Sequence, residues 1–185
     1  MVNWVLVKVL GQRSCGKVFL PNSTMEPLDY FAIKVARLYN SSSLLWEKNI
    51  LKHFIGCPEI VQCLGSEITI DENYLLYNLK LEYATSGTLA NLIEQRKKLL
   101  EDEVKEYLKM ILRGLSCIHR NRFVHVDLEP DNILAFPHNN GKMKLKIADF
   151  RLSRRCDEKD EVDEDNIYQH LCENLDGQTK RKQST

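Results

Sequence analysis

One loop constrains the fold of this chain more than any other segment does. It runs from Phe123 to Phe136 and reads FVHVDLEPDNILAF. Asp127 could accept the proton of an attacking hydroxyl, and Asn132, five residues later, could bind a metal ion. An apolar run follows directly. The pattern is typical of a loop that presents a catalytic base and a magnesium ligand, so we expect the chain to fold around a site that holds both.

The composition excludes several classes of protein. The 185 residues are 43% apolar and 28% charged, which is typical of one soluble, globular domain or a piece of a larger one. Lys and Arg together number 26, as do Asp and Glu, and this balance argues against binding to nucleic acid through phosphate contacts. No apolar run approaches the roughly 20 residues that a membrane-spanning helix needs.

The N-terminal segment and the cysteines indicate the cellular compartment of the protein. The segment NWVLVKVL is short and lacks a basic leader, so it predicts a strand rather than a secretory signal. The six cysteines form no C-x-x-C pair, and none stands at metal-binding spacing from a histidine. We therefore expect reduced thiols and a location in the cytoplasm or the nucleus.

The apolar patterns predict an α+β fold. Strands are expected over residues 3–10, 17–20, 30–36, 60–70 and 74–83, together forming a five-stranded sheet. Helices are expected over residues 44–54, 89–95 and 101–121, with a serine of the run 41–43 capping the first. A hairpin is expected over residues 133–136 and 143–147. The acidic tail 156–185 is expected to be mostly disordered.

Three further motifs carry residues that could act on a phosphate. LGQRSCGKV, from Leu10 to Val18, places two glycines between strands, where the backbone could approach phosphates closely. FAIKVA places Lys34 within a strand, and Glu47 on the following helix could pair with it. KIADF places Asp149 at a strand end, where it would meet solvent and could bind magnesium.

Each of these motifs has a plainer interpretation when it stands alone. A pair of glycines between strands is more often a simple hairpin, and a lysine in a strand usually faces solvent. An isolated aspartate at a strand end usually forms a turn. The order and spacing of all four motifs along one chain are nevertheless hard to obtain by chance.

Taken in order, the motifs resemble those of the catalytic domain of protein kinases, over roughly Trp4 to Arg155. The segments CPEIVQCLGSEIT, LLYNLKLEYATSGTLANLI and ILRGLSCIHRNRFVHVDL are similar to those of plant MAP kinase kinase kinases. The resemblance implies a protein-kinase-like α+β fold. Its five-stranded N-lobe would cover about residues 1–83, and an incomplete, mainly helical C-lobe would cover about residues 84–155.

The resemblance also implies roles for individual residues. Lys34, held by Glu47, would contact the phosphates of ATP; Asp127 would be the catalytic base; and Asn132 and Asp149 would bind Mg²⁺. The reaction would transfer the γ-phosphoryl group of ATP to a Ser or Thr hydroxyl of a protein substrate or partner in a MAP kinase cascade. The implied ATP-binding positions are Leu10, Gly11, Gly16, Val18, Ala32, Lys34, Leu81, Glu82, Ala84 and Leu134.

Several residues depart from the family pattern. Arg13 replaces a glycine of the phosphate-covering loop, and Val126 replaces an arginine before the catalytic aspartate. Glu129 stands where a lysine usually neutralises the γ-phosphate; at 4 Å and an effective dielectric of ~20, one unit of repulsion costs about 4 kcal/mol. Arg151 replaces the glycine after Asp149 and could lock that aspartate in one conformation.

The chain also carries no APE-like motif after DFRLSRR, so we expect it to be truncated after its DFG-like motif. Three interpretations stay open. The chain could be an active Ser/Thr kinase, a pseudokinase or partner-binding module without phosphoryl transfer, or a shortened product without a stable fold. The departures and the truncation oppose catalysis more strongly than they oppose binding of Mg-ATP.

Overall fold

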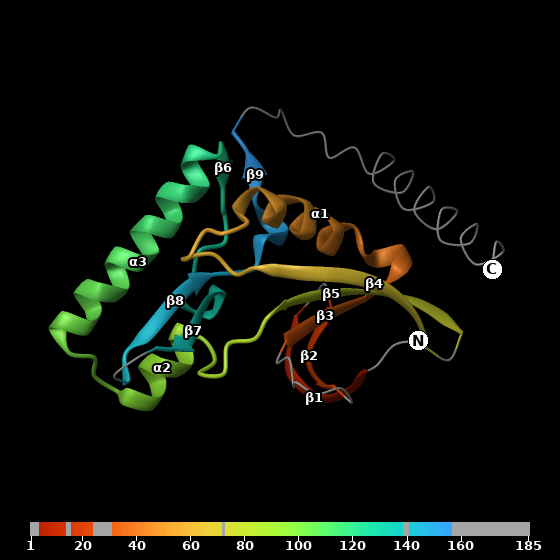
Figure 1. The fold of residues 1–185 in the computed structure, drawn as a ribbon, viewed down its shortest axis with the longest axis horizontal. Helices are drawn as coiled ribbons and strands as arrows, with labels where there is room; N and C mark the ends of the chain where they lie inside the picture. The colour runs from red at the N-terminus through yellow and green to blue at the C-terminus, as the bar shows by residue number, and fades with distance from the viewer. Residues whose placement is uncertain (1–3, 14–15, 24–30, 72, 139–140, 157–185) are drawn as a thin grey trace.

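The computed structural model describes residues 4–13, 16–23, 31–71, 73–138 and 141–156, so the predicted tail lies outside the described residues except for Cys156. Figure 1 shows two parts, with an antiparallel sheet and α1 on one side and α2, α3 and a hairpin on the other. The predicted α+β, protein-kinase-like fold is confirmed.

The sheet of the first part has five strands in the order β1-β2-β3-β5-β4. Their bounds are β1 (Trp4–Arg13), β2 (Gly16–Ser23), β3 (Phe31–Arg37), β4 (Cys63–Asp71) and β5 (Tyr74–Glu82). Strand β2 continues through Pro21, which the sequence assigned to a loop. Proline is tolerated there because the pairing of β2 with β3 covers only Lys17–Phe19, so Pro21 pairs with β1 alone.

Helix α1 (Ser42–Leu51) packs against the sheet and continues into the 3₁₀ turn η2 (Lys52–Phe54). Its buried residues are Leu44, Glu47, Ile50 and Leu51. Ser41 occupies the N-cap position, as predicted, but its hydroxyl donates to the carbonyl oxygen of Leu38 at 2.7 Å instead of accepting from the helix. The 3₁₀ turn η1 (Leu38–Asn40), directly before the helix, places that carbonyl within reach.

The second part consists of α2 (Leu89–Arg96), α3 (Glu101–Arg120) and the hairpin β7 (Ile133–Pro137) and β8 (Met143–Ile147). A small ladder joins β6 (Phe123–Val124) to β9 (Arg154–Arg155), and the 3₁₀ turns η3 (Pro130–Asn132) and η5 (Phe150–Leu152) lie between these strands. Thr88 caps α2, because its hydroxyl accepts from the N–H of Asn91 at 3.2 Å and the Asn91 side chain accepts from Thr88 N–H at 3.0 Å.

One hydrophobic core joins the two parts. Phe54 from η2, Ile118 from α3 and Phe150 from η5 are each fully buried in it. The ring centroids of Phe54 and Phe150 lie 5.4 Å apart. Two backbone hydrogen bonds add to this contact. The N–H of Ile147 donates to the carbonyl of Glu59 at 2.8 Å, and the carbonyl of Ile147 accepts from the N–H of Val61 at 3.0 Å. The sheet and the hairpin are thereby held in a fixed relation.

The cysteines differ from the sequence prediction. Cys57, on the loop after η2, forms a disulfide bond with Cys117 of α3, so the expectation of reduced thiols is wrong for this pair. The two lie 60 residues apart in sequence, which is why their spacing gave no sign of pairing. Among the described cysteines, Cys63 and Cys156 are free thiols.

Within the described part of the chain, none of the helices combines the length and the apolar character that crossing a bilayer requires.

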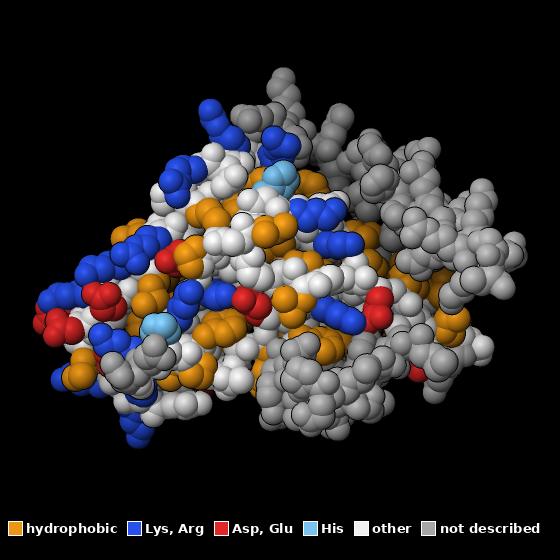
Figure 2. Space-filling view, in the orientation of Figure 1, with side chains coloured by type: hydrophobic (Ala, Val, Ile, Leu, Met, Phe, Trp, Pro, Cys, Tyr) orange, Lys and Arg blue, Asp and Glu red, His pale blue; other side chains and the backbone are white. Residues whose placement is uncertain are grey.

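Helix α3 buries only part of its apolar face: Ile118 is buried, and Ile111 and Leu115 pack against the core. Tyr107, Gly114 and Ile118 are buried, whereas Leu108 and Leu112 are 52% and 61% exposed. Charged side chains of both signs are interspersed along this end of the molecule (Figure 2), with ion pairs such as Lys105–Glu101 at 2.8 Å. The glycine decides the packing: a Cβ at Gly114 would stand 2.8 Å from Ile147 Cδ1 and 3.2 Å from the Glu59 carbonyl oxygen.

We therefore expect Gly114→Val to lower the free energy of unfolding by about 1–3 kcal/mol, the usual cost of overpacking a core. The matched control is Ser116→Val, which places the same side chain on an exposed position of α3 and isolates the helix propensity of valine. Urea unfolding followed by circular dichroism measures both. Equal unfolding midpoints for the two variants would contradict the close contact of α3 with β8.

Candidate functional site

A cavity of about 780 Å³ lies between the sheet and the second part of the chain. Its apolar walls come from β2 and β3 on one side and from β7 on the other. It opens between the segment after β5 and the turn η5. The predicted site residues that line it are Val18, Ala32, Lys34, Leu81, Glu82, Ala84, Asn132, Leu134 and Asp149.

Four residues of the predicted ATP-binding set belong to β1 and β2: Leu10, Gly11, Gly16 and Val18. Gly11 pairs with Val18, and Gly16 pairs with Arg13, so the turn between the two strands is where the sequence placed it. The side chains of Leu10 and Arg13 lie outside the described residues, as do residues 14–15. The predicted phosphate-covering role of this turn stays a prediction.

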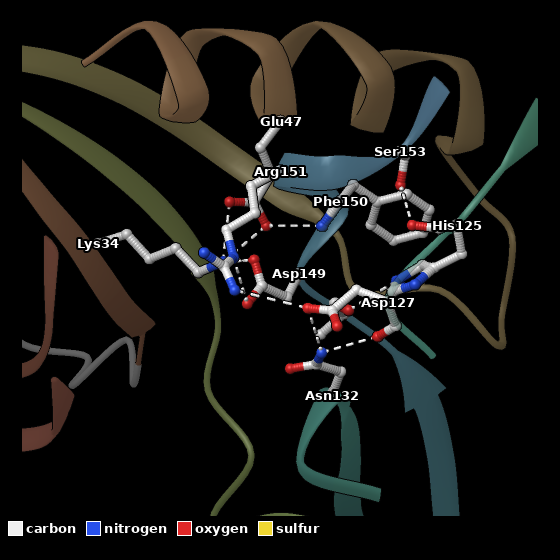
Figure 3. A network of polar contacts seen from close by, with 10 residues as sticks. Lys34, Glu47, His125, Asp127, Asn132, Asp149, Phe150, Arg151 and Ser153 are labelled. Carbon is white, nitrogen blue, oxygen red and sulfur yellow. Dashed lines mark hydrogen bonds and ion pairs between the residues drawn. The ribbon is translucent and has the colours of Figure 1, made fainter. Parts of the chain in front are cut away.

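A buried cluster of charges closes one end of the cavity. Lys34 Nζ lies 2.8 Å from both carboxylate oxygens of Glu47 and 3.0 Å from Asp149 Oδ1 (Figure 3). Glu47 is 0% exposed, because α1 turns it toward β3. Lys34 therefore points inward, which the strand pattern alone did not determine.

The environment shifts the pKa values of both Glu47 and Lys34. Burial raises the pKa of Glu47 above its ordinary value, and Lys34 opposes only part of that rise. Burial alone would lower the pKa of Lys34, but the carboxylates of Glu47 and Asp149 outweigh it, so the pKa of Lys34 also lies above its ordinary value. Within the pair, each charge offsets part of the desolvation cost of the other.

Hydrogen bonds made by His125 and Asn132 hold the loop between these two residues in place. The His125 ring is buried; its Nε2 donates to the Ala148 carbonyl at 2.9 Å, and burial lowers its pKa. The Asn132 amide donates to the backbone carbonyl of Asp127 at 2.8 Å and to its Oδ2 at 3.1 Å. Asp127 and Asn132 therefore lie together, as the loop pattern indicated.

Two residues, one within this loop and one close to it, have positive φ angles that are unfavourable for residues other than glycine. Val126 has φ of 70° and Asp149 has φ of 66°. A β-branched residue at positive φ is rare, so the contacts of His125 and Asp127 on either side of Val126 must hold the loop in this form.

Glu129 is exposed, and among the described residues of this loop the cavity is lined by Asp131 and Asn132 rather than by Glu129.

Asp149 does not meet solvent, contrary to the sequence prediction. Strand β8 ends two residues earlier, and Asp149 is 6% exposed. Its Oδ1 accepts from Lys34, and its Oδ2 accepts from Arg151 Nε at 3.3 Å. The next residue, Phe150, donates its N–H to Glu47 Oε1 at 3.3 Å, which fixes the backbone at this point.

Arg151 has a wider reach than the sequence suggested. Besides its contact with Asp149, its Nη2 lies 3.5 Å from Asp127 Oδ2, so one guanidinium lies between the two carboxylates (Figure 3). The sequence pointed only to a lock on Asp149. The signal for the second contact was the replacement of a glycine by a long cationic side chain next to two carboxylates, and only the folded loop brings Asp127 within its reach.

The predicted Mg²⁺ ligands can be tested against these contacts. Both oxygens of Asp149 accept from cations, and Asp127 Oδ2 accepts from Arg151 and Asn132. Mg²⁺ needs near-octahedral oxygen ligands, and a guanidinium already lies between the two carboxylates. No group of three or more His, Cys, Asp or Glu suited to a metal occurs among the described residues. As arranged, Asn132 and Asp149 do not fit a magnesium ion while Arg151 contacts Asp149, and the predicted role of the two residues as metal ligands stays a prediction.

Removing the cation from the buried pair should destabilise the fold. We expect Lys34→Met to lower the free energy of unfolding by about 3–5 kcal/mol, because the Glu47 carboxylate would be left buried and uncompensated. The loss should be smaller near pH 5.5 than near pH 8. With Lys34 gone the pKa of Glu47 rises further, so the folded state binds a proton that the unfolded state does not, and its stability grows as pH falls.

Urea unfolding at the two pH values measures this effect. Lys105→Met is the matched control, since Lys105 forms exposed ion pairs on α3 that contribute little to stability. The same loss for both variants, or a loss for Lys34→Met that does not change with pH, would contradict the account of the buried pair.

Comparison with known proteins places this geometry in a family. The family model of the protein kinase domain matches residues 4–174. The chain is 34% identical over 161 residues to mitogen-activated protein kinase kinase kinase 20 of Arabidopsis thaliana, covering 84% of this chain and 46% of that protein. It is 36% identical over 153 residues to calcium-dependent protein kinase 4 of Plasmodium falciparum, covering 80% of this chain and 28% of that protein.

A third relative, mitogen-activated protein kinase kinase kinase 17 of Arabidopsis thaliana, is 30% identical over 158 residues, which are 84% of this chain and 41% of that protein. The chain therefore spans less than half the length of these three relatives. The predicted resemblance to kinases of the MAP kinase kinase kinase type is confirmed. Since the family model covers most of the chain, this protein belongs to the protein kinase domain family.

Proposed function

We propose that this chain binds ATP in the cavity between its two parts, as the nucleotide-binding region of a Ser/Thr protein kinase-like domain of the MAP kinase kinase kinase type. The observation that carries the proposal is the position of Lys34. Its ammonium group, buried against Glu47 and Asp149, lines a cavity that also has apolar lining residues, among them Val18, Ala32, Leu81 and Leu134. A planar apolar ring with an attached polyphosphate matches such a cavity.

The adenine would contact Val18 on β2, Ala32 on β3, Leu81 on β5 and Leu134 on β7, which all line the cavity. Backbone groups of Glu82 and Ala84 would bond the purine edge. The Glu82 side chain supports this segment, because it accepts from Lys146 Nζ at 2.8 Å and from Gln62 N–H at 3.0 Å. The phosphates would then extend toward Lys34 and the turn at Gly11 and Gly16.

Phosphoryl transfer is the reaction that such a site would support. Asp127 would accept the proton of a Ser or Thr hydroxyl while that oxygen attacks the γ-phosphorus and the bond to ADP breaks. The protein that supplies the hydroxyl would be a substrate or partner in a MAP kinase cascade. Family members in general use ATP with Mg²⁺, but the metal does not fit the site as it is arranged here, so no step is assigned to it.

A second function is favoured by one specific contact. The Asp127 carboxylate accepts from Asn132 and contacts the Arg151 guanidinium, and both interactions weaken a general base. A module that binds nucleotide, or a partner protein, without phosphoryl transfer is consistent with that arrangement. Glu129, on the same loop, adds a negative charge where the family carries a lysine.

Ala32→Phe tests the binding proposal. A phenyl ring at this position would occupy the place assigned to adenine, so the affinity for ATP should fall at least tenfold, as measured by titration calorimetry. Lys98→Phe is the control, since Lys98 is exposed and lies outside the cavity lining. A folded Ala32→Phe variant that binds ATP as tightly as the control would contradict the position assigned to the adenine.

Transfer of labelled phosphate from ATP to a Ser/Thr peptide library separates the two functions. A working base contributes about 10²–10⁴ in rate, so an active kinase would lose that much on Asp127→Asn. Because Arg151 and Asn132 engage Asp127, we expect the chain and the Asp127→Asn variant to transfer phosphate at the same background rate. A drop of 100-fold or more in the variant would show that Asp127 acts as a base and would exclude the module without transfer.

A further inference from the structure

The guanidinium of Arg151 occupies a distinctive position in the site. Its Nε contacts Asp149 Oδ2 at 3.3 Å and its Nη2 contacts Asp127 Oδ2 at 3.5 Å, from a side chain that is only 16% exposed. The residue also lines the cavity, and like Lys34 it contacts the Asp149 carboxylate. A cation thus lies between Asp127, the proposed base, and Asp149, one of the two predicted ligands of Mg²⁺.

The charges of the cluster are nearly balanced without a metal ion. Glu47, Asp127 and Asp149 contribute three negative charges, and Lys34 and Arg151 contribute two positive charges. A divalent ion held by Asp149 would meet the guanidinium at close range and would be repelled by it. Binding of such an ion would therefore require that Arg151 leave Asp149.

The backbone around Arg151 opposes such a departure. The preceding residue, Phe150, is fully buried and donates its N–H to Glu47. Two residues further on, Ser153 is buried; its carbonyl accepts from Trp46 Nε1 at 2.8 Å, and its hydroxyl donates to the His125 carbonyl at 3.2 Å. The side chain of Arg151 is therefore carried by a turn that is anchored at both ends.

Guanidinium is also a good ligand for phosphate. It presents five N–H donors in a planar fork that matches two oxygens of a phosphate group, and it stays charged at every accessible pH. A polyphosphate in the cavity would meet Lys34 and Arg151 on one side. Two protein cations can then supply the neutralisation that a metal ion supplies elsewhere.

We infer that Arg151 takes the place of the divalent cation, so that this chain binds nucleoside di- and triphosphates in their metal-free form through Lys34 and Arg151. The inference rests on the proposed nucleotide site and deepens it, because it names the form of the ligand. It also accounts for the misfit of Mg²⁺ at Asn132 and Asp149. The residue that breaks the family pattern becomes a binding residue.

The test is a calorimetric titration of the purified chain with ADP and with ATP, in buffer containing EDTA and in buffer containing Mg²⁺. We expect binding in EDTA to be at least as tight as binding in Mg²⁺, because Mg²⁺ competes with Lys34 and Arg151 for the phosphates of the nucleotide. Binding that is at least tenfold weaker in EDTA would overturn the inference and leave the proposed nucleotide site standing. No binding in either buffer would overturn both.

Two variants identify the residue responsible. Arg151→Gly should bind ADP at least tenfold more weakly in EDTA and should recover affinity when Mg²⁺ is added. It should also bind Mn²⁺ in the presence of ADP, which paramagnetic resonance detects directly, whereas the unmodified chain should not. Arg122→Gly, at an exposed position with φ of 63°, is the control and should behave like the unmodified chain.

An Arg151→Gly variant that folds and binds ADP in EDTA as tightly as the control would exclude Arg151 as the phosphate ligand. If the variant does not fold, the comparison of EDTA with Mg²⁺ on the unmodified chain decides the inference without it. Mn²⁺ bound by the unmodified chain with ADP present would likewise contradict the inference, because the guanidinium would then not occupy the metal position.

Discussion

The contact of Lys34 with Glu47 and Asp149 is the interaction on which the rest of this structure depends. It joins β3, α1 and the segment after β8, which are distant in sequence. A buried ion pair contributes little net stability, because desolvation offsets most of the attraction. Its effect is geometric: each charge is tolerable only when the others are in place, so the cluster fixes how the sheet, the helix and the turn meet.

The same constraint shapes the cavity. Because Phe150 is buried in the shared core and its N–H is held by Glu47, the side chains on either side of it, Asp149 and Arg151, are turned toward the cavity. The backbone of Asp149 adopts positive φ to allow this. An arginine in the next-but-one position then reaches Asp127 as well, and the loop that carries the proposed base is connected to the phosphate end of the site.

The sequence predicted those parts of the fold in which one pattern dominates. The five strands, the three helices and the hairpin follow from apolar periodicity and turn residues, and the pairing of Lys34 with Glu47 follows from the motif order. Errors arose where tertiary contacts decide. Apolar spacing on α3 does not show which of its residues find a partner: Ile118 is buried, whereas Val104, Leu108 and Leu112 are exposed. Neither the burial of Asp149 nor the bond between Cys57 and Cys117 can be read from local patterns.

The most direct test of this account is thermal unfolding of the purified chain with and without ATP. A ligand that binds only the folded form adds about 2.7 kcal/mol of stability at 100 times its dissociation constant. The account predicts one cooperative transition whose midpoint rises with ATP concentration. A cooperative transition that does not move at saturating ATP would contradict the nucleotide site. The absence of any cooperative transition would contradict the folded arrangement around Lys34 itself.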